Sequence, residues 1–376
     1  MRTTRAVVYL DNLRRNIRGA REKAGSHRKI CFPVKGDAYG HGAVPLSRCA
    51  LEAGVEYLAV AVVSEGAELR AAGISAPILL FAQALPEEIP DIISQGLIPL
   101  VSDPEFVGEV EKAAQKANKK VTMHLKVNTG MGRVGCRPED AVSLATKISS
   151  SKWLCLEGTA THLSVADSLD PDNVAYTKEQ LRRFRETVDS LKKAGLNPGI
   201  VHAANSGGLV FHEDSYFDMI RPGIFFYGYS PADHPSNKRI ASAGLSAEPL
   251  MQFKSVVVAV KKVRKGEAVS YGRTWIAPED TLLGVLQVGY TDGFTRVLSN
   301  NYSVQIRGKT YPVVGRICMD QCMINLGSKT DVQRWDEVVI FGPGFVSAGD
   351  IADMLKTVPH EITCNINKRV PREYVG

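Results

Sequence analysis

The 376-residue chain lacks the features that would place a protein in a membrane or on a nucleic acid. No stretch of 18 or more residues is uniformly apolar, so no membrane span is expected. The apolar run within residues 1–17 is too short for a secretory signal and is followed at once by charged residues. Long runs of one charge are missing too, because the net charge of +6 arises from 46 scattered basic and 40 acidic residues. We therefore expect a cytoplasmic protein with neither a membrane nor a nucleic-acid partner.

The cysteines are irregularly spaced. The seven cysteines are odd in number and include no CxxC pair. A disulfide framework needs paired cysteines, and a structural zinc site needs closely spaced ligands. We expect free thiols in a reducing compartment and no bound metal. The mild positive charge is compatible with a small anionic ligand.

Short apolar runs alternate with amphipathic stretches over the first two thirds of the chain. The runs are too short and too uniformly apolar for helices, which predicts buried strands. They occupy residues 30–35, 57–63, 77–82, 97–102, 121–128, 154–162, 200–206 and 217–223. Stretches between them, such as 104–118 and 173–194, have a helical pattern. This α/β alternation predicts a (β/α)8 barrel of the TIM type, with a doubly wound open sheet as the alternative.

The pattern changes near residue 235. Residues 233–248 contain proline, serine, asparagine and glycine and are typical of a linker. Strand-like runs follow at 252–260, 282–288, 302–306, 311–315, 323–326 and 337–341, with one short helix near 347–356. We predict a barrel domain over residues 1–240 and a mostly β C-terminal domain over residues 241–376.

Polar side chains stand at the ends of several predicted barrel strands. In such barrels the chemistry collects at the carboxyl ends of the strands. The side chains concerned are Lys35, Lys126, His162, Ser206 and Arg221. A single strand-end lysine often extends its ammonium group to water, but a buried lysine is rare unless it is paired or functional. The convergence of several such ends favours a functional site.

Glycine-rich loops follow some of these strands. Residues 36–42 include three glycines and a tyrosine, which suits either a plain turn or a loop that approaches a ligand closely. Glycines at 207, 208 and 223 predict a phosphate-binding cradle. A strand-end lysine beside such a cradle indicates a phosphorylated aldehyde held covalently by the lysine amine. An aldolase would fit this pattern as well.

Several segments, in chain order, resemble motifs of the alanine racemases, which use pyridoxal 5'-phosphate. Residues 34–42 are similar to the cofactor-lysine motif of that family, and Tyr271 stands where its catalytic tyrosine is found. The other similar segments are 128–133, 202–206, 221–224, 289–293 and 315–320. The resemblance covers nearly the whole chain.

This resemblance implies a barrel followed by a β domain, with a first strand at residues 6–10 joined to the C-terminal domain. It implies a head-to-tail homodimer that racemises alanine and supplies D-alanine for peptidoglycan. Each active site would combine Lys35 of one subunit with Tyr271 of the other. The two side chains would act as bases on opposite faces of the α-carbon, Lys35 toward D-alanine and Tyr271 toward L-alanine.

The resemblance also implies roles for the other site residues. His162 and Arg221 would support Tyr271 as a relay, and Arg221 would contact the pyridine nitrogen. Arg133 would bind the substrate carboxylate, and Lys126 matches a lysine that is often carbamylated in the family. The phosphate would be bound by Tyr39, Ser206, Gly223, Ile224 and Tyr374, and the substrate also by Met319 and Tyr271.

Some positions depart from the usual family pattern. Gly36 and Asn128 replace the alanine and aspartate that are common there, and Leu163, Thr291 and Thr295 also differ. A related racemase acting on serine, or on lysine and arginine, is therefore an alternative. A decarboxylase of this barrel class would have no use for Tyr271, and a non-catalytic carrier of the cofactor would lack the C-terminal domain.

Overall fold

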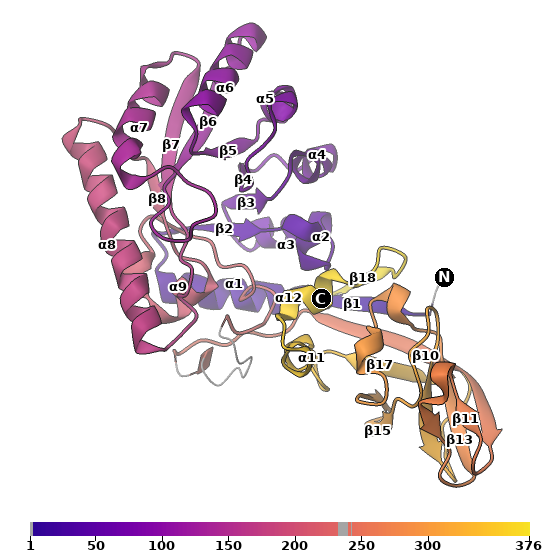
Figure 1. Cartoon of the computed structure of the whole chain (residues 1–376). Helices are drawn as coiled ribbons and strands as arrows, with labels where there is room; N and C mark the ends of the chain where they lie inside the picture. The colour runs from indigo at the N-terminus through magenta and orange to yellow at the C-terminus, as the bar shows by residue number, and fades with distance from the viewer. Residues whose placement is uncertain (1–2, 232–239, 242) are drawn as a thin grey trace. The chain divides into compact units, whose positions relative to one another are not determined.

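The computed structural model describes residues 3–231, 240–241 and 243–376, which form two compact units (Figure 1). The barrel unit comprises Leu13–Ala38 and Ala43–Ala247. The β unit comprises Met1–Asn12, Tyr39–Gly42 and Glu248–Gly376. Most of the first half of the expected linker, residues 233–239, and residue 242 lie outside the described residues.

Parallel strands form the centre of the barrel unit. They are β2 (Lys29–Pro33), β3 (Tyr57–Val60), β4 (Ile78–Leu80), β5 (Ile98–Val101), β6 (Val121–Lys126), β7 (Leu154–Ala160), β8 (Ile200–His202) and β9 (Met219–Ile220). Neighbours pair in chain order, and β9 pairs with β2. Beside β8, the Asp218 and Arg221 amides donate to the carbonyls of Val201 and Ala204. The sheet is therefore a nearly closed barrel, which confirms the predicted fold class over the open sheet.

Helices follow most of the barrel strands and surround them (Figure 1). They are α1 (Leu10–Ala24), α3 (Ala43–Glu52), α4 (Val63–Ala71), α5 (Ile89–Gln95), α6 (Pro104–Ala117), α7 (Ala141–Ser150), α8 (Pro171–Lys193) and α9 (Ser206–Phe211). The longest, α8, begins after Asp170, whose carboxylate accepts the Asp172 and Asn173 amides as a helix cap. Alternate strand residues such as Tyr57, Leu100 and Met219 pack in one core cluster.

The β unit contains one large sheet and a small hairpin. The sheet contains β1 (Arg5–Tyr9), β10 (Met251–Val263), β13 (Thr281–Leu286), β14 (Ser303–Ile306), β15 (Lys309–Pro312), β16 (Cys322–Gly327), β17 (Glu337–Phe341) and β18 (Arg372–Val375). β1 lies between β10, which is antiparallel to it, and β18, which is parallel. The N-terminal strand thus belongs to the sheet of the β unit. The hairpin pairs β11 (Ala268–Val269) with β12 (Trp275–Ile276), and the helices are α11 (Ala348–Leu355) and α12 (Pro359–Cys364).

The strands end earlier than their apolar runs. β2 ends at Pro33 and β7 at Ala160, so Lys35 and His162 follow the strands instead of closing them. The predicted strand at 311–315 begins and ends earlier, as β15. In the described part of the chain, no helix combines the length and the apolar character needed to cross a bilayer.

Candidate active site

A strained turn follows the first barrel strand. Lys35 begins the helical turn α2 (Lys35–Tyr39), in which the four residues from Gly36 to Tyr39 have φ angles between 51° and 61°. Left-handed backbone costs about 1–2 kcal/mol for each residue that has a Cβ. The Glu65 carboxylate stabilises the turn by accepting the Gly36 amide at 2.6 Å. Backbone strain of this kind concentrates at functional positions, which agrees with the predicted role of Lys35.

Basic side chains from four strand ends act on one another electrostatically. Burial lowers the pKa of Lys126 well below its usual range, and the charges of Arg221 and Arg133 lower it further. Burial likewise lowers the pKa of His162, with added effects from Lys126, Arg221, Arg133 and Lys35. The structure thus brings together the five basic residues that the sequence singled out. Their mutual repulsion favours neutral forms of Lys126 and His162 or the binding of an anion.

Arg221 is buried and held by three hydrogen bonds. Its Nη1 donates to Nδ1 of His202 at 2.7 Å, and its Nη2 donates to the carbonyls of Thr161 at 2.8 Å and Ala203 at 3.2 Å. Burial lowers the pKa of Arg221 to about 10, which leaves the guanidinium charged at neutral pH. The relay from His162 to Arg221 stays a prediction, since Arg221 contacts His202.

The ends of the seventh and eighth barrel strands lie together. Ser206 begins α9, and its Oγ accepts the Phe225 amide at 3.2 Å. Gly223 and Ile224 immediately precede Phe225 in the chain, so the predicted phosphate-binding residues of the barrel unit are neighbours. Asn205 caps α9 by accepting the Gly208 amide at 2.9 Å, and this fixes the start of the helix.

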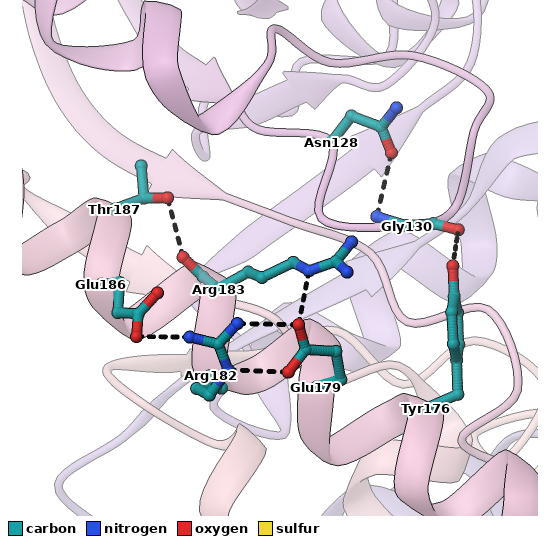
Figure 2. A network of polar contacts seen from close by, with 8 residues as sticks. All are labelled: Asn128, Gly130, Tyr176, Glu179, Arg182, Arg183, Glu186 and Thr187. Atoms are coloured by element: carbon teal, nitrogen blue, oxygen red, sulfur yellow. Dashed lines mark hydrogen bonds and ion pairs between the residues drawn. The ribbon is translucent and has the colours of Figure 1, made fainter.

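The loop after β6, which carries Arg133, is closed by its own asparagine (Figure 2). Oδ1 of Asn128 accepts the amides of Gly130 at 3.1 Å and Gly132 at 3.0 Å. The Tyr176 hydroxyl of α8 donates to the Gly130 carbonyl at 2.8 Å. A Cβ on Gly130 would lie 2.5 Å from that hydroxyl, so any other residue would displace the Tyr176 side chain. The amide of Asn128 therefore supplies the loop with the acceptor that an aspartate would also provide.

Gln180, one turn further along α8, holds the segment that carries His162. Its Nε2 donates to the His162 carbonyl at 3.1 Å, and its Oε1 accepts the Ser164 amide and hydroxyl, both at 3.0 Å. One helix therefore fixes the loop of Arg133 and the backbone of His162.

In the β unit, Tyr39 and Tyr374 are held around one short segment. The Tyr374 hydroxyl donates to the His41 carbonyl at 3.1 Å. A Cβ on Gly42 would lie 1.9 Å from that hydroxyl, so any other residue would displace the Tyr374 side chain. Burial raises the pKa of Tyr39 to about 12, and its ring contacts the His360 ring at a tilt of 39°.

Tyr271 lies in the turn of the β11–β12 hairpin. The preceding residue, Ser270, has a φ of 65° and donates its hydroxyl to the Arg316 carbonyl at 2.7 Å. This bond fastens the hairpin to the loop that carries Met319, whose carbonyl accepts the Thr291 amide at 3.2 Å. Segments 270–272, 289–293 and 315–320 therefore meet in one place. Tyr271 is 69% exposed and Met319 is 52% exposed.

The sequence pattern gives no role to three residues linked to Arg221. His202 lies in one of the segments that resemble family motifs, and His124 and Glu157 lie in none of them. A signal was present, because His124 precedes Lys126 by two residues and so faces the same side of β6.

The fold and the site define the class of protein. It is a parallel-barrel enzyme whose lysine amine and clustered basic side chains suit a small anionic ligand. Residues 8–231 match the family model described as alanine racemase, N-terminal domain, and residues 250–374 match alanine racemase, C-terminal domain. The chain belongs to the alanine racemase family.

Individual relatives agree with this assignment. The alanine racemase of Treponema denticola is 46% identical over 100% of this chain and 99% of the relative. The structure of alanine racemase from Clostridium difficile 630 has a TM-score of 0.93 at 35% identity and covers 100% of this chain and 96% of that one. A structure from Bartonella henselae "with covalently bound pyridoxal phosphate" has a TM-score of 0.85 at 27% identity and covers both chains fully. The activity is that of an alanine racemase, an isomerase, as the sequence predicted.

Proposed function

We propose that this racemase uses pyridoxal 5'-phosphate held by Lys35, and that it supplies D-alanine for peptidoglycan in the cytoplasm. The observation that carries the proposal is the cluster of Lys35, Lys126, His162 and Arg221 at the carboxyl ends of the barrel strands. The covalent pyridoxal phosphate of the Bartonella henselae structure supports the same cofactor here. When bound, this cofactor withdraws electrons from the α-carbon and so makes the α-proton acidic.

The donor set of the chain fits this cofactor. The Lys35 amine suits an aldehyde, and the remaining N–H groups of Arg221 suit a pyridine nitrogen. Because arginine keeps its proton at neutral pH, that nitrogen would accept a hydrogen bond and stay unprotonated. The phosphate would be bound by Tyr39, Ser206, Gly223, Ile224 and Tyr374.

Racemisation needs a proton to leave one face of the α-carbon and another to arrive on the opposite face. Lys35 and Tyr271 would serve as the two bases, with His162 and Arg221 supporting Tyr271. The exposure of Tyr271 and Met319 supports a homodimer in which a second copy contributes both residues. Arg133 and the backbone amide of Met319 would then bind the substrate carboxylate and orient the α-proton.

Lys126 would act as a carbamate. Burial and two nearby arginines favour its neutral amine, which is the form that attacks carbon dioxide. The reaction forms one N–C bond, releases one proton and leaves a negative charge. That charge would pair with Arg133 and fix its guanidinium.

The test is exchange of the α-proton in heavy water. Purified holoenzyme is incubated with L-alanine, L-serine or L-lysine, while α-deuterium and optical rotation are followed. We expect alanine to racemise faster than serine by about tenfold or more, because the added hydroxyl needs room in the site. Faster reaction of serine or lysine would refute the substrate assignment alone, and a lack of exchange with all three would refute the proposed activity.

A further inference from the structure

Four side chains form a continuous hydrogen-bonded chain through the barrel unit. Nη1 of Arg221 lies 2.7 Å from Nδ1 of His202, and Nε2 of His202 lies 2.8 Å from Nδ1 of His124. Nε2 of His124 lies 3.1 Å from a carboxylate oxygen of Glu157. Arg221 and both histidines are buried, so each contact must contain one donor and one acceptor.

The two ends of this chain determine the tautomer of both histidines. Arginine can only donate, so Nδ1 of His202 must be an acceptor and its Nε2 must carry the proton. That proton is donated to Nδ1 of His124, and the proton of His124 therefore sits on Nε2. Nε2 of His124 donates to Glu157, which as a carboxylate can only accept. Every donation runs in one direction, from Arg221 to Glu157.

The charge states agree with this direction. Burial lowers the pKa of His202 well below its usual range and lowers the pKa of His124, so both rings are neutral near pH 7. The hydrogen bond from His124 lowers the pKa of Glu157. The Tyr57 hydroxyl and the charge of Lys29 also lower it, so the carboxylate is ionised.

The backbone of β7 is adapted to this hydrogen-bonded chain of side chains. His124 pairs with Gly158, whereas the preceding Met123 pairs with Leu156, so Glu157 is the extra residue of a bulge. Bulges near active sites redirect a side chain, and this one places Glu157 at His124. A Cβ on Gly158 would lie 2.7 Å from the His124 ring and 2.7 Å from the Ile200 carbonyl oxygen of β8, so the glycine leaves room for the ring and for the neighbouring strand.

We propose that Glu157 is a positioning residue for the racemase reaction, which acts on Arg221 through His124 and His202. This inference rests on the proposed contact between Arg221 and the pyridine nitrogen. Glu157 holds the histidine protons in the order that presents an acceptor nitrogen to Arg221. Reversal of the order would place an N–H of His202 against an N–H of Arg221 and turn the guanidinium away from its position.

The first test measures the tautomers directly. The holoenzyme is labelled with ¹⁵N-histidine, and long-range ¹H–¹⁵N spectra report which ring nitrogen carries the proton. Signals are assigned by their loss in His124→Gln and His202→Gln. We expect a protonated Nε2 and an unprotonated Nδ1 in both rings. A protonated Nδ1 in either ring would overturn the inference, whatever the activity of the enzyme.

The second test changes the Glu157 end of the hydrogen-bonded chain. Glu157→Leu removes the acceptor of His124. The buried Nε2–H of His124 is then left unsatisfied, which opposes the proton order that Arg221 favours, so we expect a mixture of tautomers at His202 and a kcat lower by about tenfold, with KM changed less. Glu157→Gln should restore most of the kcat, because the amide oxygen accepts the same hydrogen bond.

Glu56→Gln is the matched control. Glu56 precedes Tyr57 at the start of β3 and accepts the Ile30 amide at 2.8 Å and an Arg21 N–H at 3.0 Å, outside the histidine chain. The Glu56→Gln variant should leave the His202 tautomer and kcat unchanged. The inference is wrong if Glu157→Leu lowers kcat without altering the His202 signals, or if Glu56→Gln has the same effect. Should Glu157→Leu fail to fold, Glu157→Gln and the wild-type spectra still decide.

Discussion

At the residue scale, burial among other cations sets the protonation of the site. Lys126 and His162 are basic groups whose charged forms lose solvation and meet the charges of arginines. A neutral His162 can pass a proton without a large change in local charge, and a neutral Lys126 can react with carbon dioxide. The same environment leaves Arg221 charged, because its pKa of about 10 is still above neutral pH.

A Tyr271→Phe variant tests the division of labour between the two bases. Removing the phenol hydroxyl should abolish exchange of the α-proton of L-alanine, while Lys35 still exchanges that of D-alanine. Racemisation should fall by about 10²–10⁴-fold, the usual contribution of one acid–base group. Deuterium exchange from each enantiomer, followed by NMR, measures the two faces separately.

Tyr311→Phe, in β15, is the control and should change neither rate. The cofactor absorbance should persist in Tyr271→Phe, since the hydroxyl takes no part in holding it. Equal loss of exchange from both enantiomers would contradict the assignment of Tyr271 to one face.

The basic residues at the strand ends were predictable from the sequence. Buried strands are apolar, so a lysine, histidine or arginine directly after one is easily recognised. Lys35, Lys126, His162 and Arg221 were found in this way. Tyr271 gave no such signal, since it is exposed and lies in a hairpin whose strands have only two residues each. Only the family resemblance identified it.

At the element scale, α8 connects two parts of the site. Tyr176 holds the Arg133 loop and Gln180 holds the His162 segment, four residues apart on one face of the helix. Figure 2 shows that Glu179 pairs instead with Arg182 and Arg183 on α8 itself. Exposed pairs of this kind contribute little to stability. The contacts of Tyr176 and Gln180 are therefore the ones through which α8 holds the segments of Arg133 and His162.

A Tyr176→Phe variant should loosen the Arg133 loop. Losing one hydrogen bond costs about 0.5–1.5 kcal/mol, so KM for alanine should rise by about two- to tenfold while kcat changes less. Steady-state kinetics in both directions measure the effect. Glu186→Gln, which removes an exposed ion pair with Arg182 from the same helix, should leave KM unchanged. A rise in KM in both variants would show that the effect comes from α8 stability instead.

The lengths of the elements limited what the pattern could predict. The barrel strands and long helices were visible as apolar runs and amphipathic stretches. Short elements such as β18 and α12 contain too few residues for a period to be recognised. The left-handed turn at Gly36–Tyr39 was not predicted either, because three of its residues have a Cβ and ordinarily avoid that conformation.

At the scale of the whole molecule, the barrel was predictable because its alternation extends over more than half of the chain. The proposed homodimer followed only from the family resemblance, because a sequence pattern does not show which exposed residues would face a second copy. Tyr271 and Met319 are exposed in the single chain, and the proposed chemistry needs them near Lys35. A site shared between two copies satisfies both conditions.

Subunit complementation tests this central claim most directly. Lys35→Ala and Tyr271→Phe chains are produced separately and together, and racemisation of alanine is measured in the purified homodimers and hybrid dimers. Each homodimer should be inactive, because all of its sites lack one base. A hybrid contains one site with both bases intact, so evenly assorted chains should recover about a quarter of the wild-type activity. Hybrid dimers with no more activity than the two inactive homodimers would contradict a site that combines Lys35 of one copy with Tyr271 of the other.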